Sequence, residues 1–386
     1  MNEGEMMERI YLDHAATTPM HPRVMEKMLE TMNETFGNPS SIHSFGREAR
    51  HKIDLARESL AKSIGAKESE IIFTSGGTEA DNMALFGVVE SEQAKGKHII
   101  TSQIEHHAVL HACHKLEKMG YEVTYLPVDE TGRVSVAELK AALRDDTILV
   151  SIMYGNNEVG TLQPIAEIGE LLKDHQAKFH TDAVQAYGIE KIDVNQTNID
   201  LLSVTAHKIN GPKGIGFLYA RENVKLVPRQ FGGEQERKRR AGTENVTSIA
   251  GFHEAVLVSA GELAEKRNRY IGFKETFIQT LREQQIEFAL NGTLEQSLPH
   301  VLNLSFPGTN VEQMLVNLDL AGIAVSSGSA CTAGSIEPSH VLVAMFGKGS
   351  ERLINSIRFS FGYNTTTEEI VRAAEDTARI VTRLKK

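Results

Sequence analysis

The sequence has little cysteine, few aromatic residues and no long apolar run. Only Cys113 and Cys331 occur among 386 residues, and tryptophan is absent. Two cysteines cannot form the disulfide framework of a small secreted domain, so a cysteine with a role here is expected to act as a free thiol. No apolar run approaches the length of about 18 residues that a membrane span needs, and residues 1–10 are polar, unlike a signal peptide. The sequence therefore predicts a soluble, cytoplasmic protein without a membrane partner.

Positive charge is also scarce. The chain has 41 Lys and Arg against 51 Asp and Glu, a net charge of −10. Proteins that neutralise nucleic-acid phosphates usually have the opposite balance. Nucleic-acid binding is therefore not expected as the main function, although the basic run 237–240 leaves open an RNA-binding module or a docking place for a partner.

Apolar strand-like segments alternate with amphipathic helical segments through the first two thirds of the chain. The predicted strands are Ile71–Thr74, His98–Thr101, Glu122–Leu126, Ile148–Met153, Phe179–Thr181 and Leu201–Val204. The predicted helices are Thr78–Glu90, Ala108–Met119, Val136–Leu143 and Pro164–Asp174. This alternation is typical of an α/β protein with a mostly parallel sheet, in which ligands bind beyond the carboxyl ends of the strands.

The pattern changes near residue 251. A long charged helix is predicted first, then short alternating strands and a closing helix: Ile249–Gln284, Ile286–Leu290, Leu302–Phe306, Ser356–Phe361 and Thr366–Leu384. We expect a large domain over residues 16–260. Residues 1–15 and 261–386 are expected to form a smaller α+β domain.

A glycine turn follows the first predicted strand of the sheet. In Thr74–Asp81 the two glycines let backbone N–H groups approach an anion at a helix N-terminus. Thr78 is expected to cap that helix, with Asp81 at the reciprocal capping position. The alternative is a well-capped turn without a ligand.

Two further strands end in residues that suit a pyridine cofactor. Asp182 closes a buried strand, where a carboxylate needs a cationic partner such as a protonated pyridine nitrogen; a helix cap is the alternative. Lys208 follows the strand Leu201–Val204 and enters a turn rich in Gly and Pro. A lysine desolvated there would have a depressed pKa and could form a Schiff base. A phosphate cradle, a counter-ion and such a lysine are what pyridoxal phosphate requires.

The whole chain resembles the cysteine desulfurases of the NifS/IscS type. The resemblance rests on the segments YLDHAATT (11–18), FGNPSSIH (36–43), TSGGTE (74–79), EHH (105–107), YGNNEVG (154–160), HTDAVQ (180–185), HK (207–208), RAGT (240–243) and SSGSAC (326–331). It implies the type I fold of pyridoxal-phosphate-dependent transferases, with a sheet of the seven-stranded type. It also implies a homodimer with active sites at the subunit interface.

The resemblance assigns roles to individual residues. It implies that Lys208 binds pyridoxal phosphate covalently, that Asp182 pairs with the ring nitrogen, and that His106 stacks on the ring and acts as an acid or base. Further cofactor contacts, with the phosphate, the ring oxygen or the substrate, are implied for Gly77, Thr78, Asn157, Gln185, Thr205, His207 and, from the neighbouring subunit, Thr243. Arg358 would bind the substrate carboxylate.

Cys331 is the implied sulfur carrier. It lies in a Ser- and Gly-rich segment that offers almost no apolar partner. The resemblance implies that L-cysteine is converted to L-alanine, and that the persulfide on Cys331 passes to an acceptor, either an iron–sulfur scaffold or a tRNA-thiolating enzyme. Cys113 lies in a helical pattern and is interpreted as structural.

Other activities remain open. Selenocysteine lyase or another class V aminotransferase would use the same cofactor. The spacing of His107, His111 and His114 could also place a zinc site on one helix face. No H-E-x-x-H motif supports such a site, and a polar helix face is the preferred interpretation.

Overall fold

A seven-stranded sheet forms the centre of the protein, for which the computed structural model describes residues 9–327 and 338–385. In spatial order its strands are β2 (Ile71–Thr74), β8 (Gly216–Ala220), β7 (Leu201–Thr205), β6 (Lys178–Asp182), β5 (Thr147–Ser151), β3 (His98–Ser102) and β4 (Glu122–Leu126). Only β8 runs antiparallel to its neighbours, β2 and β7. The predicted mostly parallel α/β sheet is confirmed.

Helices cover both faces of this sheet because successive strand residues point to opposite sides. The helices that follow the strands are α3 (Gly77–Glu92), α4 (His107–Lys118), α5 (Val136–Ala142) and α6 (Ile165–Leu172). The pair Ile72 and Leu218 belongs to the apolar cluster beneath α3 and α4, whereas the adjacent pair Phe73 and Phe217 belongs to the cluster on the other face.

Two smaller sheets lie beside the central one. The antiparallel sheet has the order β12 (Ser356–Ser360), β10 (Val301–Ser305), β9 (Ala289–Leu290), and a parallel pair joins β1 (Ile10–Tyr11) to β11 (Ile323–Ala324). Their helices are α8 (Val311–Leu320), α9 (His340–Phe346), α10 (Arg352–Asn355) and α11 (Thr367–Leu384). The β1–β11 pair ties the start of the described chain to its C-terminal third.

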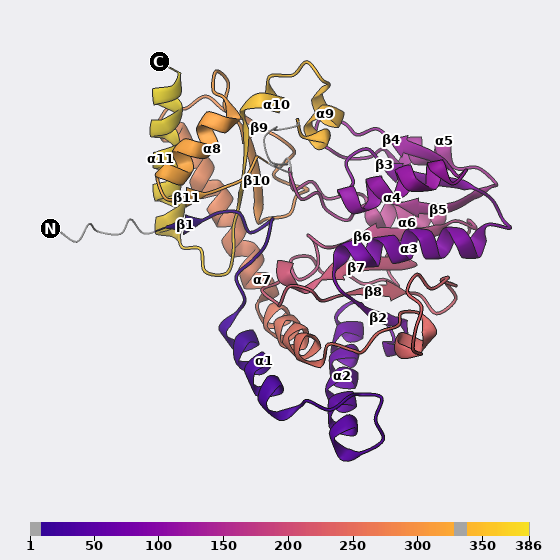
Figure 1. The fold of residues 1–386 in the computed structure, drawn as a ribbon. Helices are drawn as coiled ribbons and strands as arrows, with labels where there is room; N and C mark the ends of the chain where they lie inside the picture. The colour runs from indigo at the N-terminus through magenta and orange to yellow at the C-terminus, as the bar shows by residue number, and fades with distance from the viewer. Residues whose placement is uncertain (1–8, 328–337, 386) are drawn as a thin grey trace.

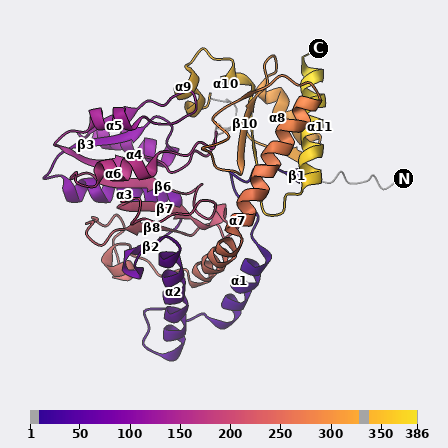
Figure 2. The same ribbon diagram turned by 180° about the vertical axis from the view of Figure 1, so that it is seen from behind.

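The 38-residue helix α7 (Val246–Glu283) connects the two regions. Figures 1 and 2 show its first half beside α1 (Pro22–Glu34) and α2 (Ser44–Ser63), and its second half beside α11. In the second half, Phe277 packs on Phe359 of β12 with ring centroids 4.5 Å apart. Among the described helices, α7 included, none is both long and apolar enough to cross a membrane.

Several elements are not predicted from the sequence. They are β1, β8, β11, α1, α2, α8, α9, α10 and the short 3-10 helices η1 (Glu68–Glu70), η2 (Ala206–Lys208) and η3 (Gln235–Lys238). All five residues of β8 are buried, so the strand has no polar–apolar alternation, and it directly follows a Gly- and Pro-rich turn. The N-caps of helices α1 and α2 are His21 and His43, whose imidazoles accept the capping hydrogen bonds. Histidine is not among the usual N-cap residues.

Candidate active site

A cavity of about 420 Å³ opens at the carboxyl ends of the central strands. Ten of the twelve residues predicted for the site line it: Gly77, Thr78, His106, Asn157, Asp182, Gln185, Thr205, His207, Lys208 and Arg358. Thr243 is exposed and does not line it, and Cys331 lies outside the described residues. A larger cavity of about 880 Å³, between α7 and residues 294–299, contains none of the ten.

The N-terminus of α3 forms one wall. The helix begins at Gly77, and its N-cap, Gly76, has a φ of 151° and no side-chain cap. A Cβ on Gly77 would lie 2.7 Å from Val184 Cγ2, so any other residue would require the Val184 side chain to move. The first N–H groups of α3, with Thr78, are the donors that an anion requires. The predicted capping by Thr78 and Asp81 is wrong, because the helix begins one residue earlier and Asp81 turns inward.

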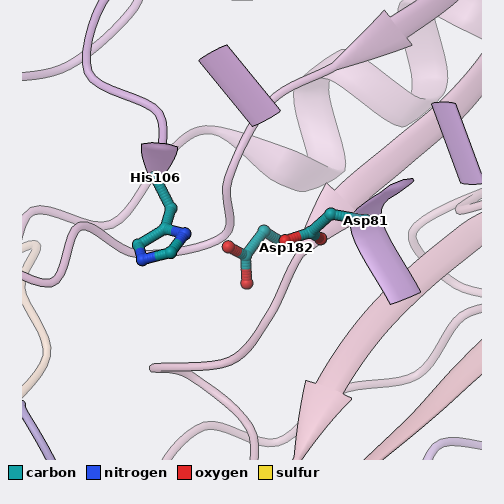
Figure 3. Close-up of side chains that lie close together, drawn as sticks. All are labelled: Asp81, His106 and Asp182. Carbon is teal, nitrogen blue, oxygen red and sulfur yellow. The ribbon is translucent and has the colours of Figure 1, made fainter. Parts of the chain in front are cut away.

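Asp81 and Asp182 lie together beneath the cavity. Figure 3 shows Asp182 between Asp81 and His106, with the Asp81 carboxyl directed toward Asp182 and the Asp182 carboxyl directed toward His106 at the start of α4; one ligand atom from each of the three lies within 4.8 Å of the others. Burial raises the pKa of both carboxyls, and the charge of Asp182 adds to the effect on Asp81. His106 and Lys208 act in the opposite direction on the pKa of Asp182. A cationic ligand group at this place would therefore stabilise the Asp182 carboxylate.

Asp182 keeps one fixed contact, since the backbone N–H of Val184 donates to its Oδ1 at 2.9 Å. The Asp81 side chain is almost completely buried, and its Oδ1 has no hydrogen-bond partner among the described residues; His180 Nε2 lies 3.6 Å from it, beyond hydrogen-bond distance. An unpaired buried oxygen of this kind is costly unless it is protonated or meets a ligand. The raised pKa of Asp81 favours its protonated form, whereas a positive group bound beside Asp182 would stabilise the carboxylate of Asp182.

Lys208 approaches the cavity from η2, directly after β7. Its Nζ donates to the carbonyl oxygens of Ala15 and Ala16, the second at 2.7 Å. Burial and then the charge of Arg358 lower the pKa of Lys208 from 10.5 to about 8. Burial at the strand end thus acts on the pKa of Lys208 in the direction expected from the sequence, and the neutral fraction of the amine near pH 7 is larger than in a solvated lysine.

Arg358 lies on the opposite side, on β12. The buried guanidinium pairs with Asp13 Oδ1 at 2.7 Å and donates to the carbonyl oxygen of Asn157 at 2.9 Å. Its Nε has no hydrogen-bond partner among the described residues. The backbone of Ser326 bonds to that of Arg358 in both directions, at 2.6 and 3.2 Å.

Described residues on either side of Cys331 in the sequence line the cavity. The described chain stops at residue 327 and resumes at 338, and both Ser326 and His340 line the cavity. On the second side, Ser339 donates to Glu158 Oε2 and caps α9, and His340 Nε2 lies 2.9 Å from the carbonyl oxygen of Glu105.

Two buried acids near the cavity are not assigned a role by the sequence. Burial raises the pKa of Glu105 to about 8 and that of Glu158 to about 7. Glu105 Oε1 accepts from Ser102 Oγ at 2.6 Å and from the Met153 N–H at 3.0 Å, which leaves Oε2 to carry the proton. The EHH segment contains Glu105, but only the fold shows that its carboxyl points inward.

The zinc alternative is not supported. His107, His111 and His114 form a row of rings with centroids 5.1 and 6.3 Å apart. Among residues 9–327 and 338–385, the only group of three with a spacing suited to a metal is Asp81, His106 and Asp182. Cys113 is buried in α4, and burial raises the pKa of its thiol to about 12, as expected of a structural cysteine.

The chain is similar to known proteins along nearly its entire length. Residues 10–372 match the family model described as aminotransferase class-V. The chain is 63% identical to IscS 1 of Bacillus subtilis, over 98% of this chain and 100% of that protein. It is 50% identical to the cysteine desulfurase IscS of Methanosarcina thermophila, over 99% of this chain and 95% of the relative. A solved NifS-like protein superposes with a TM-score of 0.91 at 36% identity, over 97% and 100% of the two chains.

Proposed function

The chain belongs to the class-V aminotransferase family, among its cysteine desulfurases of the NifS/IscS type, and from this we propose that it uses pyridoxal phosphate to take sulfur from L-cysteine, leaving L-alanine. One observation carries the proposal: a single cavity combines an uncapped helix N-terminus, a buried acid at a strand end, a lysine of lowered pKa and a buried arginine.

The donor set fits the phosphorylated pyridine. The N–H groups at the start of α3, with Thr78, Thr205 and His207, would hold the phosphate. Asp182 would pair with the ring nitrogen, since a positive group there lowers the cost of its buried charge. Asn157, Gln185 and His106 would contact the ring, and Lys208 would bind the cofactor covalently. Pyridoxal phosphate, when bound, supplies an electron sink.

Proton transfer would fall to Lys208 and His106. A lysine with a pKa near 8 is neutral often enough to remove a proton from the substrate carbon and to return it elsewhere. His106 is exposed at the N-cap of α4, where its Nδ1 accepts from the Ala108 N–H at 3.1 Å. Its Nε2 is left as the atom that can exchange a proton with a ligand.

Substrate binding and sulfur transfer would involve the opposite side of the cavity. Arg358 can offer a guanidinium edge to the carboxylate of L-cysteine. Cys331 would take the substrate sulfur as a persulfide, and the position of Ser326 and His340 at the cavity supports this role for the segment between them. Because the thiolate is the nucleophile, the reaction rate should depend on the pKa of Cys331.

Assembly as a homodimer is part of the proposal. Large apolar side chains are exposed on α1, on the connection to α2 and at the start of α2: Met25, Leu29, Met32, Phe36, Ile42 and Phe45. An apolar patch of this kind usually marks a protein interface. Arg240 pairs with Glu79 on α3 at 2.7 Å, whereas the nearby Thr243 stays exposed. Thr243 is therefore free to reach the phosphate site of a second copy.

The sulfur acceptor is proposed at the level of class. An iron–sulfur scaffold protein or a tRNA-thiolating enzyme would receive the persulfide sulfur. The cytoplasmic location and the division into domains at residues 16–260 and 1–15 with 261–386 stay predictions.

Purified protein tests the proposal. It should be yellow, carry one pyridoxal phosphate per chain by mass spectrometry after borohydride reduction, and release L-alanine from L-cysteine. Lys208→Ala is the control and should be colourless and inactive. Wild-type protein that is colourless after incubation with pyridoxal phosphate would overturn the proposal.

A further inference from the structure

Gln185 is held on two sides by groups that determine how its amide points. Its Nε2 donates to the carbonyl oxygen of Ala15 at 2.9 Å, and its Oε1 lies 3.2 Å from His300 Nε2. A carbonyl oxygen can only accept, so the NH₂ group must face Ala15. The amide oxygen then faces His300, which must donate through an Nε2–H.

His300 is suited to this single task. It is buried directly before β10, and its Nδ1 has no hydrogen-bond partner among the described residues. A proton on Nδ1 would therefore have no acceptor. Burial holds the pKa of His300 well below its usual range, and the charges of Lys274 and Lys266 on α7, of His14 and of Lys208 act in the same direction. The neutral ring with its proton on Nε2 is the stable form.

The Ala15 carbonyl links this contact to Lys208. Both Gln185 Nε2 and Lys208 Nζ donate to that oxygen. Without the His300 N–H, the Ala15 carbonyl would be the one described contact that fixes the orientation of the Gln185 amide. With its oxygen turned toward His300 and one N–H donated to Ala15, Gln185 keeps its second N–H as the donor left for a ligand in the cavity.

We propose that His300 is a positioning residue that fixes Gln185 as a hydrogen-bond donor, so that this side of the cavity selects a ligand oxygen that accepts. This inference rests on the proposed function. The accepting oxygen can belong to the ring hydroxyl of pyridoxal phosphate in its ionised form or to the carboxylate of L-cysteine. The two sources share one chemistry, and separate measurements distinguish them.

The test is a double-mutant cycle with His300→Phe and Gln185→Ala. The affinity of the apoprotein for pyridoxal phosphate, measured without substrate, and its absorbance spectrum report on the ring oxygen. The KM for L-cysteine in the holoenzyme reports on the carboxylate. His300→Phe should either lower the affinity for pyridoxal phosphate or raise the KM for L-cysteine about tenfold, which corresponds to the loss of roughly one hydrogen bond. In the Gln185→Ala background, the same substitution should change that affinity or KM by less than twofold.

Controls separate positioning from folding. His300→Gln keeps an N–H donor and should recover the wild-type value within about threefold. His98→Phe removes a buried histidine on β3, bonded to Thr124 and Thr147, and should leave both affinities unchanged. If His300→Phe does not fold, Gln185→Glu carries the same test, because a carboxylate still accepts from His300 but cannot donate to the ligand.

The outcomes are distinct. Three results would each overturn the positioning role while leaving the proposed function intact. The first is a His300→Phe variant with the wild-type affinities, and the second is an equal effect of His300→Phe with and without Gln185. The third is an unchanged affinity in Gln185→Glu. Wild-type protein that binds no pyridoxal phosphate would overturn both.

Discussion

The lowered pKa of Lys208 predicts how fast the apoprotein captures pyridoxal phosphate at each pH. Burial and the nearby Arg358 charge lower this pKa from 10.5 to about 8. At pH 7.5 about a quarter of a group with pKa 8 is neutral, against about 0.1% of a group with pKa 10.5. Since only the neutral amine attacks an aldehyde, the reactive fraction of Lys208 at this pH should be about 200-fold larger than that of an unperturbed lysine.

Stopped-flow absorbance of the covalent adduct measures the effect. The second-order rate constant should rise between pH 6 and 8 and level off above about pH 9. Arg358→Gln removes a like charge, so its midpoint should move to higher pH. Lys208→Ala should show no such phase. A wild-type rate that keeps increasing tenfold per pH unit up to pH 10 would refute the reasoning.

Three further predictions concern the substrate, a buried acid and the subunit interface. Arg358→Lys keeps the charge but loses the fork of donors, so the KM for L-cysteine should rise at least about tenfold with a smaller change in kcat; an unchanged KM contradicts the role. The unfolded chain loses the Glu105 proton near pH 4.5, whereas the folded protein loses it only near pH 8. As the pH rises between these values, the wild type should therefore lose stability relative to Glu105→Gln, by up to roughly 5 kcal/mol in chemical denaturation. A constant difference would refute the buried protonated acid. Two inactive variants test the interface: Lys208→Ala, and the double variant Arg240→Ala with Thr243→Ala. Mixing them should restore activity, because a hybrid dimer contains one intact site. Full activity in a monomer would contradict this.

Much of the central sheet could be predicted because its strands are short, buried apolar runs separated by amphipathic helices. Six strands follow this pattern, and the prediction for β2 has the observed limits. The seventh, β8, could not be separated from the glycine-rich turn before it, since a strand buried on both faces has no alternation of its own. The N-terminal helices α1 and α2 were missed for a different reason, because their caps are histidines.

The site was predictable where a functional residue directly follows a strand. Asp182 and Lys208 were identified in this way, and the fold brings both to one cavity. Residues whose importance depends on burial were not accessible from the sequence. Asp81 was assigned to a helix cap but faces Asp182, and the hydrogen bond between His300 and Gln185 joins residues 115 positions apart. Only tertiary packing reveals such contacts.

The most direct test of the central claim follows the sulfur of radiolabelled L-cysteine in Cys331→Ser and Cys113→Ser. A hydroxyl is a poor nucleophile toward sulfur and is almost never ionised near neutral pH. Cys331→Ser should therefore stay yellow, fold normally and change its spectrum when cysteine is added. It should nevertheless yield neither L-alanine nor protein-bound label at a useful rate, whereas Cys113→Ser should retain most of both. Wild-type turnover by Cys331→Ser together with an inactive but folded Cys113→Ser would contradict the account.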